Sequence, residues 1–358
     1  MKNSMNKIKR FIFKLTFNAS DRRDIYESFR GYQMDNLSAE DTFDRLISVY
    51  SRRGKKPNQP IALILAECKG NLAAGSNVAN SFSEWFPEDE VSILNSCERA
   101  GNLIKGFENA SSFASQMVAI SDAKKSTRNT FLYMSFLTFG LIIMFCMMMV
   151  PAIQLFVPIE QWSGMELSLW YLYVGIRDFW FFIILFVVVL IVLLNRSYNR
   201  WTGVLRNKAD NYFPYSVHKR IQGSIFIMNM NAMLSADIPM EEAVESLIEY
   251  TNSAWMRERL EAISGAIKSG DKNLGTALDS TGFEFPSVDA IIKMQSLFDT
   301  KNGIKSMERF SDEWMKKTVL SLEHLSTIVR VGSMFACGGS IMFLVSVMSN
   351  LLQNISSF

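Results

Sequence analysis

The sequence predicts an all-α integral membrane protein with two duplicated cytoplasmic helical-bundle domains and three transmembrane helices. Three apolar stretches interrupt an otherwise charged chain, at Phe131–Val150, Phe179–Leu194 and Val331–Leu352. No stretch alternates apolar and polar residues with the period of two that a half-buried strand requires. The polar blocks before the first and third apolar stretches repeat one order of helices and turns, which predicts a duplication.

The apolar stretches fit the thickness of a bilayer. A helix rises about 1.5 Å per residue, so about 20 apolar residues cross a hydrocarbon core of about 30 Å. The second stretch follows Arg177 and Asp178. We expect this pair at an interface, because each charge costs about 2.5 to 3.5 kcal/mol at the bilayer centre. The transmembrane helices are therefore assigned to residues 129–153, 172–195 and 329–352.

The placement of basic residues predicts the orientation, although the formal net charge is only +2. Basic residues precede the first and third apolar stretches and follow the second: Lys124, Lys125, Arg128, Arg196, Arg200, Arg206, Lys208, Lys316, Lys317 and Arg330. Lys and Arg near membrane spans stay in the cytoplasm. We therefore expect residues 21–128 and 209–328 in the cytoplasm, and the loop 154–171 and the tail 353–358 on the opposite side.

Residues 1–20 are predicted to form a basic amphipathic arm. Ile8, Phe11, Ile12 and Leu15 recur at helical spacing among basic residues. The arm lacks a small-residue cleavage site, so we expect it to be retained rather than removed as a signal peptide. Two interpretations stay open: a solvated tail, or a segment that docks on anionic lipid or on an acidic partner.

The first cytoplasmic block, residues 21–128, is predicted to be a series of short helices. A capping signal at Ser38 starts a helix that ends before Gly54. Two further helices pass through Ile61–Cys68 and Val91–Cys97. Proline and glycine mark the turns and helix ends in this part: Gly70, Gly75, Pro87 and Gly101. A long helix then runs from Leu103 toward the membrane.

The second block, residues 209–328, is predicted to follow the same order. Its helices are expected at 225–234, at 240–250, up to residue 267, near Ala277 and around 291–294, before a long helix toward the membrane. At an offset of about 200 residues, turn and cap residues of the two blocks coincide: Leu37 with Ile238, Glu40 with Glu241, Asp41 with Glu242, Gly75 with Gly270, Pro87 with Pro286 and Gly101 with Gly303. Duplication accounts for this better than chance similarity of amphipathic helices.

The chain lacks the motifs of common enzyme classes. It has no G-x-x-x-x-G-K-[ST] phosphate loop and no H-E-x-x-H zinc motif, and its two histidines, His218 and His324, are far apart. The four cysteines have no C-x-x-C spacing, and Cys146 and Cys337 fall inside apolar stretches. We expect no catalytic residue, no metal, no cofactor and no nucleic-acid partner.

Small residues gather in the third apolar stretch: Ser333, Ala336, Cys337, Gly338, Gly339 and Ser340. Small side chains at a spacing of four allow close helix approach in lipid, where packing drives association. The set predicts a helix-packing face. Its partner is either another span of the same chain, a second copy, or a membrane helix of another subunit.

The sequence resembles the PilC/GspF family, the inner-membrane platform proteins of type IV pilus and type II secretion machines. The likeness covers residues 24–352 in the order block, span, span, block, span. Residues 234–243 (LSADIPMEEA) are similar to the family's Leu-x-x-Gly-Val-Pro-Leu-x-x-Ala segment, and residues 98–103 (ERAGNL) to its Gly-Glu-x-[Ser/Ala]-Gly-x-Leu segment. Asp237 and Cys97 stand where the family has Gly, and residues 299–303 lack the Glu. These departures indicate a divergent branch such as that of the type IVb pili.

The resemblance implies a non-enzymatic, multi-pass scaffold of the bacterial inner membrane, with its loop and tail in the periplasm. It implies that the scaffold couples a cytoplasmic hexameric ATPase to insertion or extraction of pilins or pseudopilins. It further implies contacts with other inner-membrane assembly proteins and membrane lipid, and a homo-oligomer. Carried onto this sequence, the candidate partner contacts are Glu98, Gly101, Glu241 and Glu242. The alternative is a polytopic membrane sensor or transporter accessory subunit whose helical domains bind a ligand.

Overall fold

The computed structural model describes residues 7–155, 158–162, 164–271, 273–299 and 303–356. Every regular element in these ranges is a helix, and three helices are long and apolar enough to cross a membrane. The predicted all-α class with three membrane-competent helices is confirmed. Parts of the predicted arm (1–6), loop (156, 157 and 163), 299–303 segment (300–302) and tail (357–358) lie outside the described residues.

The chain divides into two compact units. One combines residues 1–121 with 198–318, and the other combines 122–197 with 319–358. We call the first two segments lobe 1 and lobe 2, and the second unit the span unit. The sequence predicted separate blocks ending at residues 128 and 328. Those domain bounds stay a prediction; the division into units falls at residues 121/122 and 318/319, inside continuous helices.

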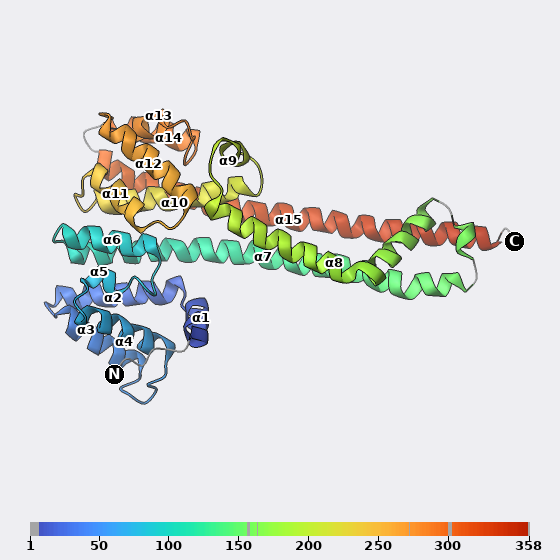
Figure 1. The fold of residues 1–358 in the computed structure, drawn as a ribbon, viewed down its shortest axis with the longest axis horizontal. Coiled ribbons are helices and arrows are strands. Elements are labelled where there is room, and N and C mark those ends of the chain that lie inside the picture. Colours follow the sequence, from blue (N-terminus) through green and yellow to red (C-terminus); the bar gives the residue numbers. More distant parts are fainter. Residues whose placement is uncertain (1–6, 156–157, 163, 272, 300–302, 357–358) are drawn as a thin grey trace. The chain divides into compact units, whose positions relative to one another are not determined.

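Lobe 1 contains α1 (Lys7–Thr16), α2 (Ala19–Met34), α3 (Ala39–Tyr50), α4 (Pro60–Ala73), α5 (Val78–Ser81), α6 (Glu88–Arg99) and the start of α7 (Leu103–Gln154) (Figure 1). Ser38 accepts a hydrogen bond from the Asp41 N–H and caps α3, as predicted. Gly75, at φ +98°, ends α4. Gly70, predicted to mark a turn, lies inside α4, because a single glycine lowers helix stability without ending a helix.

Lobe 1 has an aromatic core, and the N-terminal arm packs against it. Phe29 and Phe43 pack edge to face, with ring centroids 4.8 Å apart. Arg10 of α1 pairs with Glu67 at 3.1 Å and lies 5.3 Å from the Trp85 ring centroid. The arm is therefore helical from residue 7 and held by an acidic side chain of its own chain, while Phe11 and Ile12 stay exposed.

Lobe 2 contains α9 (Val204–Ala209), α10 (Tyr215–Leu234), α11 (Met240–Tyr250), α12 (Ala254–Lys268), α13 (Leu274–Ser280), α14 (Val288–Phe298) and the start of α15 (Gly303–Ser356). The predicted bounds of α11 are confirmed. The helix expected at 225–234 begins ten residues earlier, at Tyr215. Its first half alternates polar and buried residues irregularly, so its periodicity is weak.

The two lobes contain helices in the same order. The order α2 to α6 followed by α7 is repeated as α10 to α14 followed by α15, with similar lengths. The turns agree as well. Asn36 and Asp237 both adopt a positive φ, of 59° and 61°, between the first two helices, and Gly75 and Gly270 both do so before the short helix.

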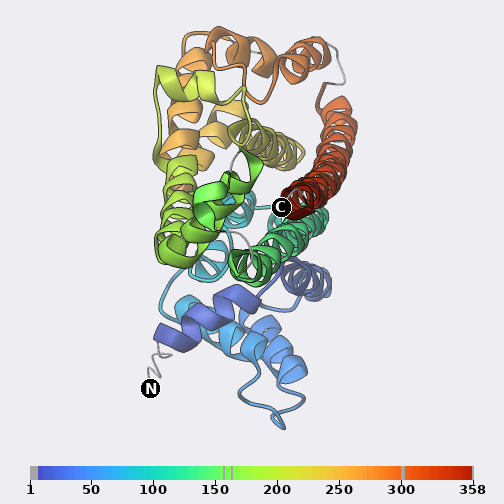
Figure 2. The same ribbon diagram turned by 90° about the vertical axis from the view of Figure 1, so that its right-hand side faces the viewer.

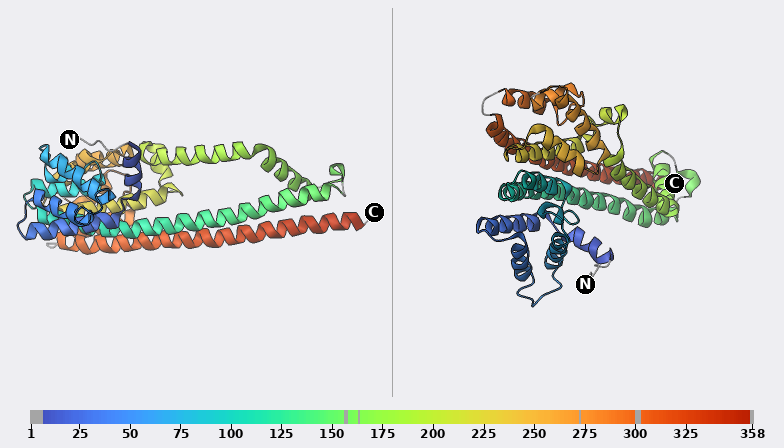
Figure 3. Two further views of the ribbon diagram at one scale, coloured as in Figure 1. Left: turned by 90° about the horizontal axis from the view of Figure 1, so that it is seen from below. Right: turned by 60° about the vertical axis from the view of Figure 1, so that its left-hand side comes forward.

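The span unit contains the apolar parts of α7 and α15, the short 3₁₀ helix η1 (Ile159–Gln161) and α8 (Met165–Arg200). All three long helices contribute to one buried cluster that includes Cys146, Val150, Leu169, Leu344 and Val347. Thr127 of α7 donates a hydrogen bond to the Leu322 carbonyl of α15 at 3.3 Å. Figure 3 shows α8 running apart from the other two helices over much of its length. In agreement with this, no residue is buried in the apolar window of α8, its most apolar 18-residue segment.

Candidate functional site

Lobe 1 and lobe 2 meet along α6. This helix packs on α10 and α11, and Figure 2 shows it between the helices of the two lobes. Eight of its residues are buried, including the polar Ser92 and Ser96. Both serine hydroxyls contact the hydroxyl of Ser246 in α11, at 3.1 and 2.7 Å. The junction therefore has a hydrogen-bonded polar centre, whereas the core of lobe 1 is apolar.

Further hydrogen bonds cross the junction away from the serines. The Asn229 amide donates to Asp89 at 3.0 Å, and the Asn252 backbone N–H donates to Glu88 at 3.0 Å. The Asn109 amide donates to the carbonyl of Ala232 at 2.6 Å. Because each bond requires one relative position of the two lobes, the set fixes their registry.

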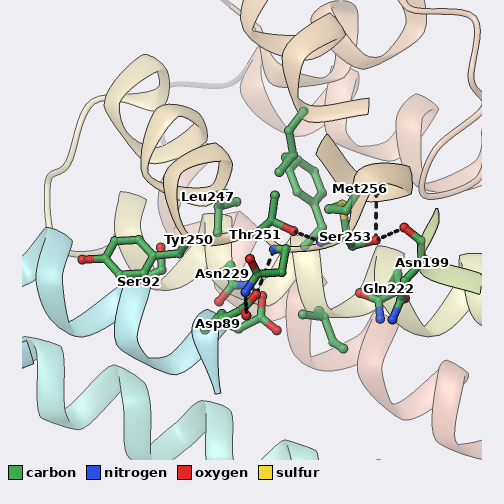
Figure 4. A pocket seen from close by; sticks show the side chains of 15 residues that line it. Asp89, Ser92, Asn199, Gln222, Asn229, Leu247, Tyr250, Thr251, Ser253 and Met256 are labelled. Carbon is green, nitrogen blue, oxygen red and sulfur yellow. Dashed lines mark hydrogen bonds between the residues drawn. The ribbon is translucent and has the colours of Figure 1, made fainter. Parts of the chain in front are cut away.

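A cavity of about 260 Å³ lies beside these bonds. Figure 4 shows the Asp89 carboxylate and the Asn229 amide facing each other at its wall. Other lining side chains include Gln222, Tyr250 and Met256. The wall mixes polar and apolar groups, so it does not form the apolar pocket expected of the alternative, a ligand-binding sensor domain.

Asp89 is a half-buried carboxyl group at this wall. Burial raises the pKa of Asp89 to about 6, the hydrogen bond from Asn229 opposes that rise, and the nearby Glu90 and Glu88 carboxylates add to it. The Asn229 Oδ1 atom is buried without a donor among the described residues. One face of the cavity thus presents acceptor oxygen atoms that internal donors satisfy only in part.

Within the described ranges, no three His, Cys, Asp or Glu side chains are placed to hold a metal ion. The cavity wall contains no histidine or cysteine. What the arrangement provides is a polar junction between two helical lobes, with one carboxyl group whose pKa is raised to about 6.

The structure places the four sequence-predicted contact residues around the end of α6. The half-buried Glu98 carboxylate accepts hydrogen bonds from the backbone N–H groups of Val78 and Ala79, at 2.9 and 2.8 Å. It therefore caps the start of α5. Gly101 follows α6 at φ +74°, a conformation that favours glycine.

Glu241 and Glu242 lie in the first turn of α11, where acidic side chains favour the helix dipole. Glu242 pairs with Arg99, the last residue of α6, at 3.6 Å across the junction. Glu241 is exposed. Of the three acidic candidates, Glu98 and Glu242 thus already have partners within the chain, and Glu241 has the more accessible carboxylate.

The span unit exposes apolar side chains along all three helices. The apolar window of α8 has no buried residue, and in α15 Phe335 and Met342 are 78 % and 77 % exposed. Contiguous apolar surface of this extent requires lipid or another protein to cover it. Arg177 and Asp178 of α8 bond to each other at 2.7 Å, and their place at a membrane interface stays a prediction.

The small-residue set of α15 is mostly unpacked within the chain. A Cβ atom added at Gly338 or Gly339 would meet nothing within 4 Å. Gly339 and Ser340 line an apolar cavity of about 340 Å³, together with Ile142 and Cys146 of α7 and Leu169 of α8. This surface has room for a further helix or a lipid chain beside α15.

Several residues of the junction were not found from the sequence. Asp89, Asn229 and Ser246 lie far apart along the chain, and nothing in one sequence pairs them. Ser92 and Ser96 carried a usable pattern, because two serines four residues apart occupy one face of a helix and alternate with the apolar Val91, Ile93, Leu94 and Cys97.

Comparison with known proteins defines the class. Residues 226–349, which cover most of lobe 2 and of α15, match the family described as Type II secretion system (T2SS), protein F. The chain therefore carries a domain of this family, and the predicted resemblance to the PilC/GspF platform proteins is confirmed. The chain is also similar in sequence to Toxin coregulated pilus biosynthesis protein E of Vibrio cholerae serotype O1. The two are 20% identical over 255 residues, which are 70% of this chain and 73% of that protein.

Proposed function

We propose that this chain is a multi-pass platform protein of the bacterial inner membrane that serves type IV pilus assembly or type II secretion. The observation that carries the proposal is the combination of a protein F domain at residues 226–349 with a pilus biosynthesis relative that spans 70% of the chain. Three membrane-competent helices and two similar helical lobes agree with such a scaffold.

The platform couples a cytoplasmic hexameric ATPase to the insertion or extraction of pilins or pseudopilins. Removing an apolar pilin helix from lipid exposes side chains at about 1.5 to 3 kcal/mol each, a total in the tens of kcal/mol. The sequence has no phosphate-loop motif, so the work comes from a partner. The role of this chain is accordingly mechanical and not catalytic.

The exposed apolar helices are the proposed contact surface for pilins, lipid and other inner-membrane assembly proteins. The window of α8 and the small-residue face of α15 have the apolar character and the free space that such contacts need. The lobes are the proposed ATPase contact. Glu241 is the leading residue there, because it is an exposed residue, whereas Glu98 and Glu242 are half-buried and have partners within the chain.

Comparison of the corresponding helices α6 and α14 of the two lobes supports a homo-oligomer. Glu88 and Ser92 of α6 bond to lobe 2, and the corresponding residues of α14 are Val288 and Ile292. These two are apolar and 50 % and 57 % exposed. Among the described residues, this face of α14 is therefore left uncovered where the corresponding face of α6 packs on lobe 2, and we propose that a second copy covers it. Ile292→Asp should lower the mass of the detergent-solubilised particle by light scattering.

The test of the function is deletion of the gene followed by imaging of fibres and assay of secreted proteins. Loss of fibres or of secretion, restored by the wild-type gene, is expected. If both processes continue in the deletion strain, the proposal is wrong.

The ATPase contact is tested by Glu241→Lys in the complemented strain. We expect fibres to be lost while the protein level stays normal, since Glu241 is exposed. Glu98→Lys is the matched comparison: it breaks the cap of α5 and should lower the protein level itself. Normal fibres in the Glu241→Lys strain would remove this residue from the contact surface.

A further inference from the structure

Lobe 2 buries more positive than negative charge. Arg206, Arg259 and Lys219 are 0 %, 1 % and 7 % exposed, and the carboxylate buried among them is that of Asp210, at 1 %. Asp210 accepts hydrogen bonds from Arg259 at 2.6 Å and from the Trp255 indole at 3.0 Å, and it also pairs with Arg206. Three buried cations thus share one buried anion.

Aromatic rings compensate part of this charge. The Arg259 guanidinium lies 3.9 Å from the Trp255 ring centroid, and that of Arg206 lies 4.2 Å from the Tyr215 centroid. The ring faces contact the guanidinium planes but do not accept hydrogen bonds from the N–H groups at the guanidinium edges. Nε and Nη2 of Arg206 and Nε of Arg259 remain buried without an acceptor among the described residues.

Lys219 is the least compensated of the three cations. Its ammonium takes part in none of the hydrogen bonds or ion pairs found among the described residues. Burial lowers the pKa of Lys219, and Asp210 and Glu284 only partly oppose that effect. Because Lys219 lines a cavity and its ammonium has no hydrogen-bonded partner among the described residues, an anion in that cavity would serve as its counter-ion.

A cavity of about 380 Å³ lies beside Lys219. Donor groups dominate its wall: Lys219, Arg220, Lys317, Ser216, Asn211, Ser287 and Trp314. The Trp314 indole N–H is buried and has no acceptor within the described part of the chain. Only Asp210 and Asp289 contribute carboxylates. Such a wall suits a compact anion rich in acceptor oxygen atoms.

We propose that this cavity of lobe 2 binds a phosphate group, with Lys219 as the buried cation that contacts it and Arg220 and Lys317 at its rim. Two sources carry that chemistry. One is the headgroup of an anionic phospholipid, because Lys317 and Trp314 belong to the same helix, α15, as an apolar membrane-competent stretch. The other is a free phosphate ion.

The test uses the full chain, purified in detergent and stripped of lipid. Thermal unfolding is followed while inorganic phosphate replaces chloride at constant ionic strength. We expect a saturable rise in Tm of several degrees, as binding to the folded state requires. Lys219→Met should lower the phosphate affinity at least tenfold, whereas Lys293→Met, an exposed lysine of α14 outside this cavity, should leave it unchanged.

Native mass spectrometry of chain purified without stripping distinguishes the sources. Retained phosphatidylglycerol in wild-type chain, lost in Lys219→Met, identifies the lipid headgroup; phosphate binding without a retained lipid identifies the free ion. Lys317→Gln, at the exposed rim, provides a second variant if Lys219→Met does not fold, with a several-fold loss of affinity expected. The proposal is overturned if wild-type chain neither retains lipid nor responds to phosphate, or if Lys219→Met responds like wild type.

Discussion

At the scale of residues, the junction of the lobes depends on buried polar groups and not on apolar packing alone. Ser92, Ser96 and Ser246 satisfy one another, while Asp89 and Asn229 form a pair that leaves one amide oxygen without a donor. A buried polar group costs free energy unless its partner is in place. The junction consequently penalises any arrangement of the lobes in which these partners separate.

The pH dependence of stability should report on Asp89. Its pKa of about 6 in the folded chain exceeds the ordinary value of 3.8 that applies when the chain is unfolded. Between these values the folded state binds more protons, so the contribution of Asp89 to stability is full below about pH 4 and is lost as the pH rises through about 6. A shift of this size corresponds to a loss of roughly 3 kcal/mol at pH 8.

The variant Asp89→Asn tests this expectation. The new amide keeps the bond from Asn229 and can donate to its free Oδ1, so the variant should be more stable than wild type at pH 8 by about 1 to 3 kcal/mol. The gain should shrink toward pH 4, measured as the difference in Tm between variant and wild type across that range. A difference independent of pH would show that Asp89 titrates normally.

At the scale of elements, the crossing of α13 and α14 depends on a glycine. A Cβ atom added at Gly275 would lie 2.2 Å from the backbone nitrogen of Gln295, a contact that requires the two helices to separate. Asn273 also donates to the Gln295 carbonyl at 2.9 Å, so the backbones are held together at this point.

Gly275→Ala should therefore destabilise the chain by about 2 kcal/mol or more, in the range of overpacked cores. Gly265→Ala is the matched control, because a Cβ atom there meets nothing within 4 Å and alanine favours the helix by about 1 kcal/mol. Thermal unfolding of the two variants should thus move in opposite directions. Equal Tm values would mean that α13 and α14 do not cross this closely.

Helices that begin at a proline were predicted closely from the sequence, and very short helices were not. Pro87 and Pro239 fix the starts of α6 and α11, since proline is compatible with helix starts and not with interiors. The four residues of α5 and the six of α9 are too short to show a helical period, so both were missed. The candidate contact Glu98 was predicted by resemblance, but its capping of α5 depends on a helix that the sequence did not reveal.

At the scale of the whole molecule, the predicted topology puts both lobes on one side of the membrane. Single cysteines at Lys55→Cys in lobe 1, Thr276→Cys in lobe 2 and Glu160→Cys in η1 are all at exposed positions. In intact cells, a membrane-impermeant maleimide should label only the cysteine at position 160, and lysis should expose the other two. Labelling of just one of the two lobes before lysis would contradict the duplicated arrangement.

The bare surface of α8 has a thermodynamic consequence. The chain buries no residue of the most apolar segment of α8. A membrane helix of another protein that leaves this surface therefore breaks no contact on which the fold of this chain depends. The free energy of its departure is then set by that helix and the surrounding lipid. Under the proposed function, the same surface of α8 could therefore serve one pilin after another without any change in the fold of this chain.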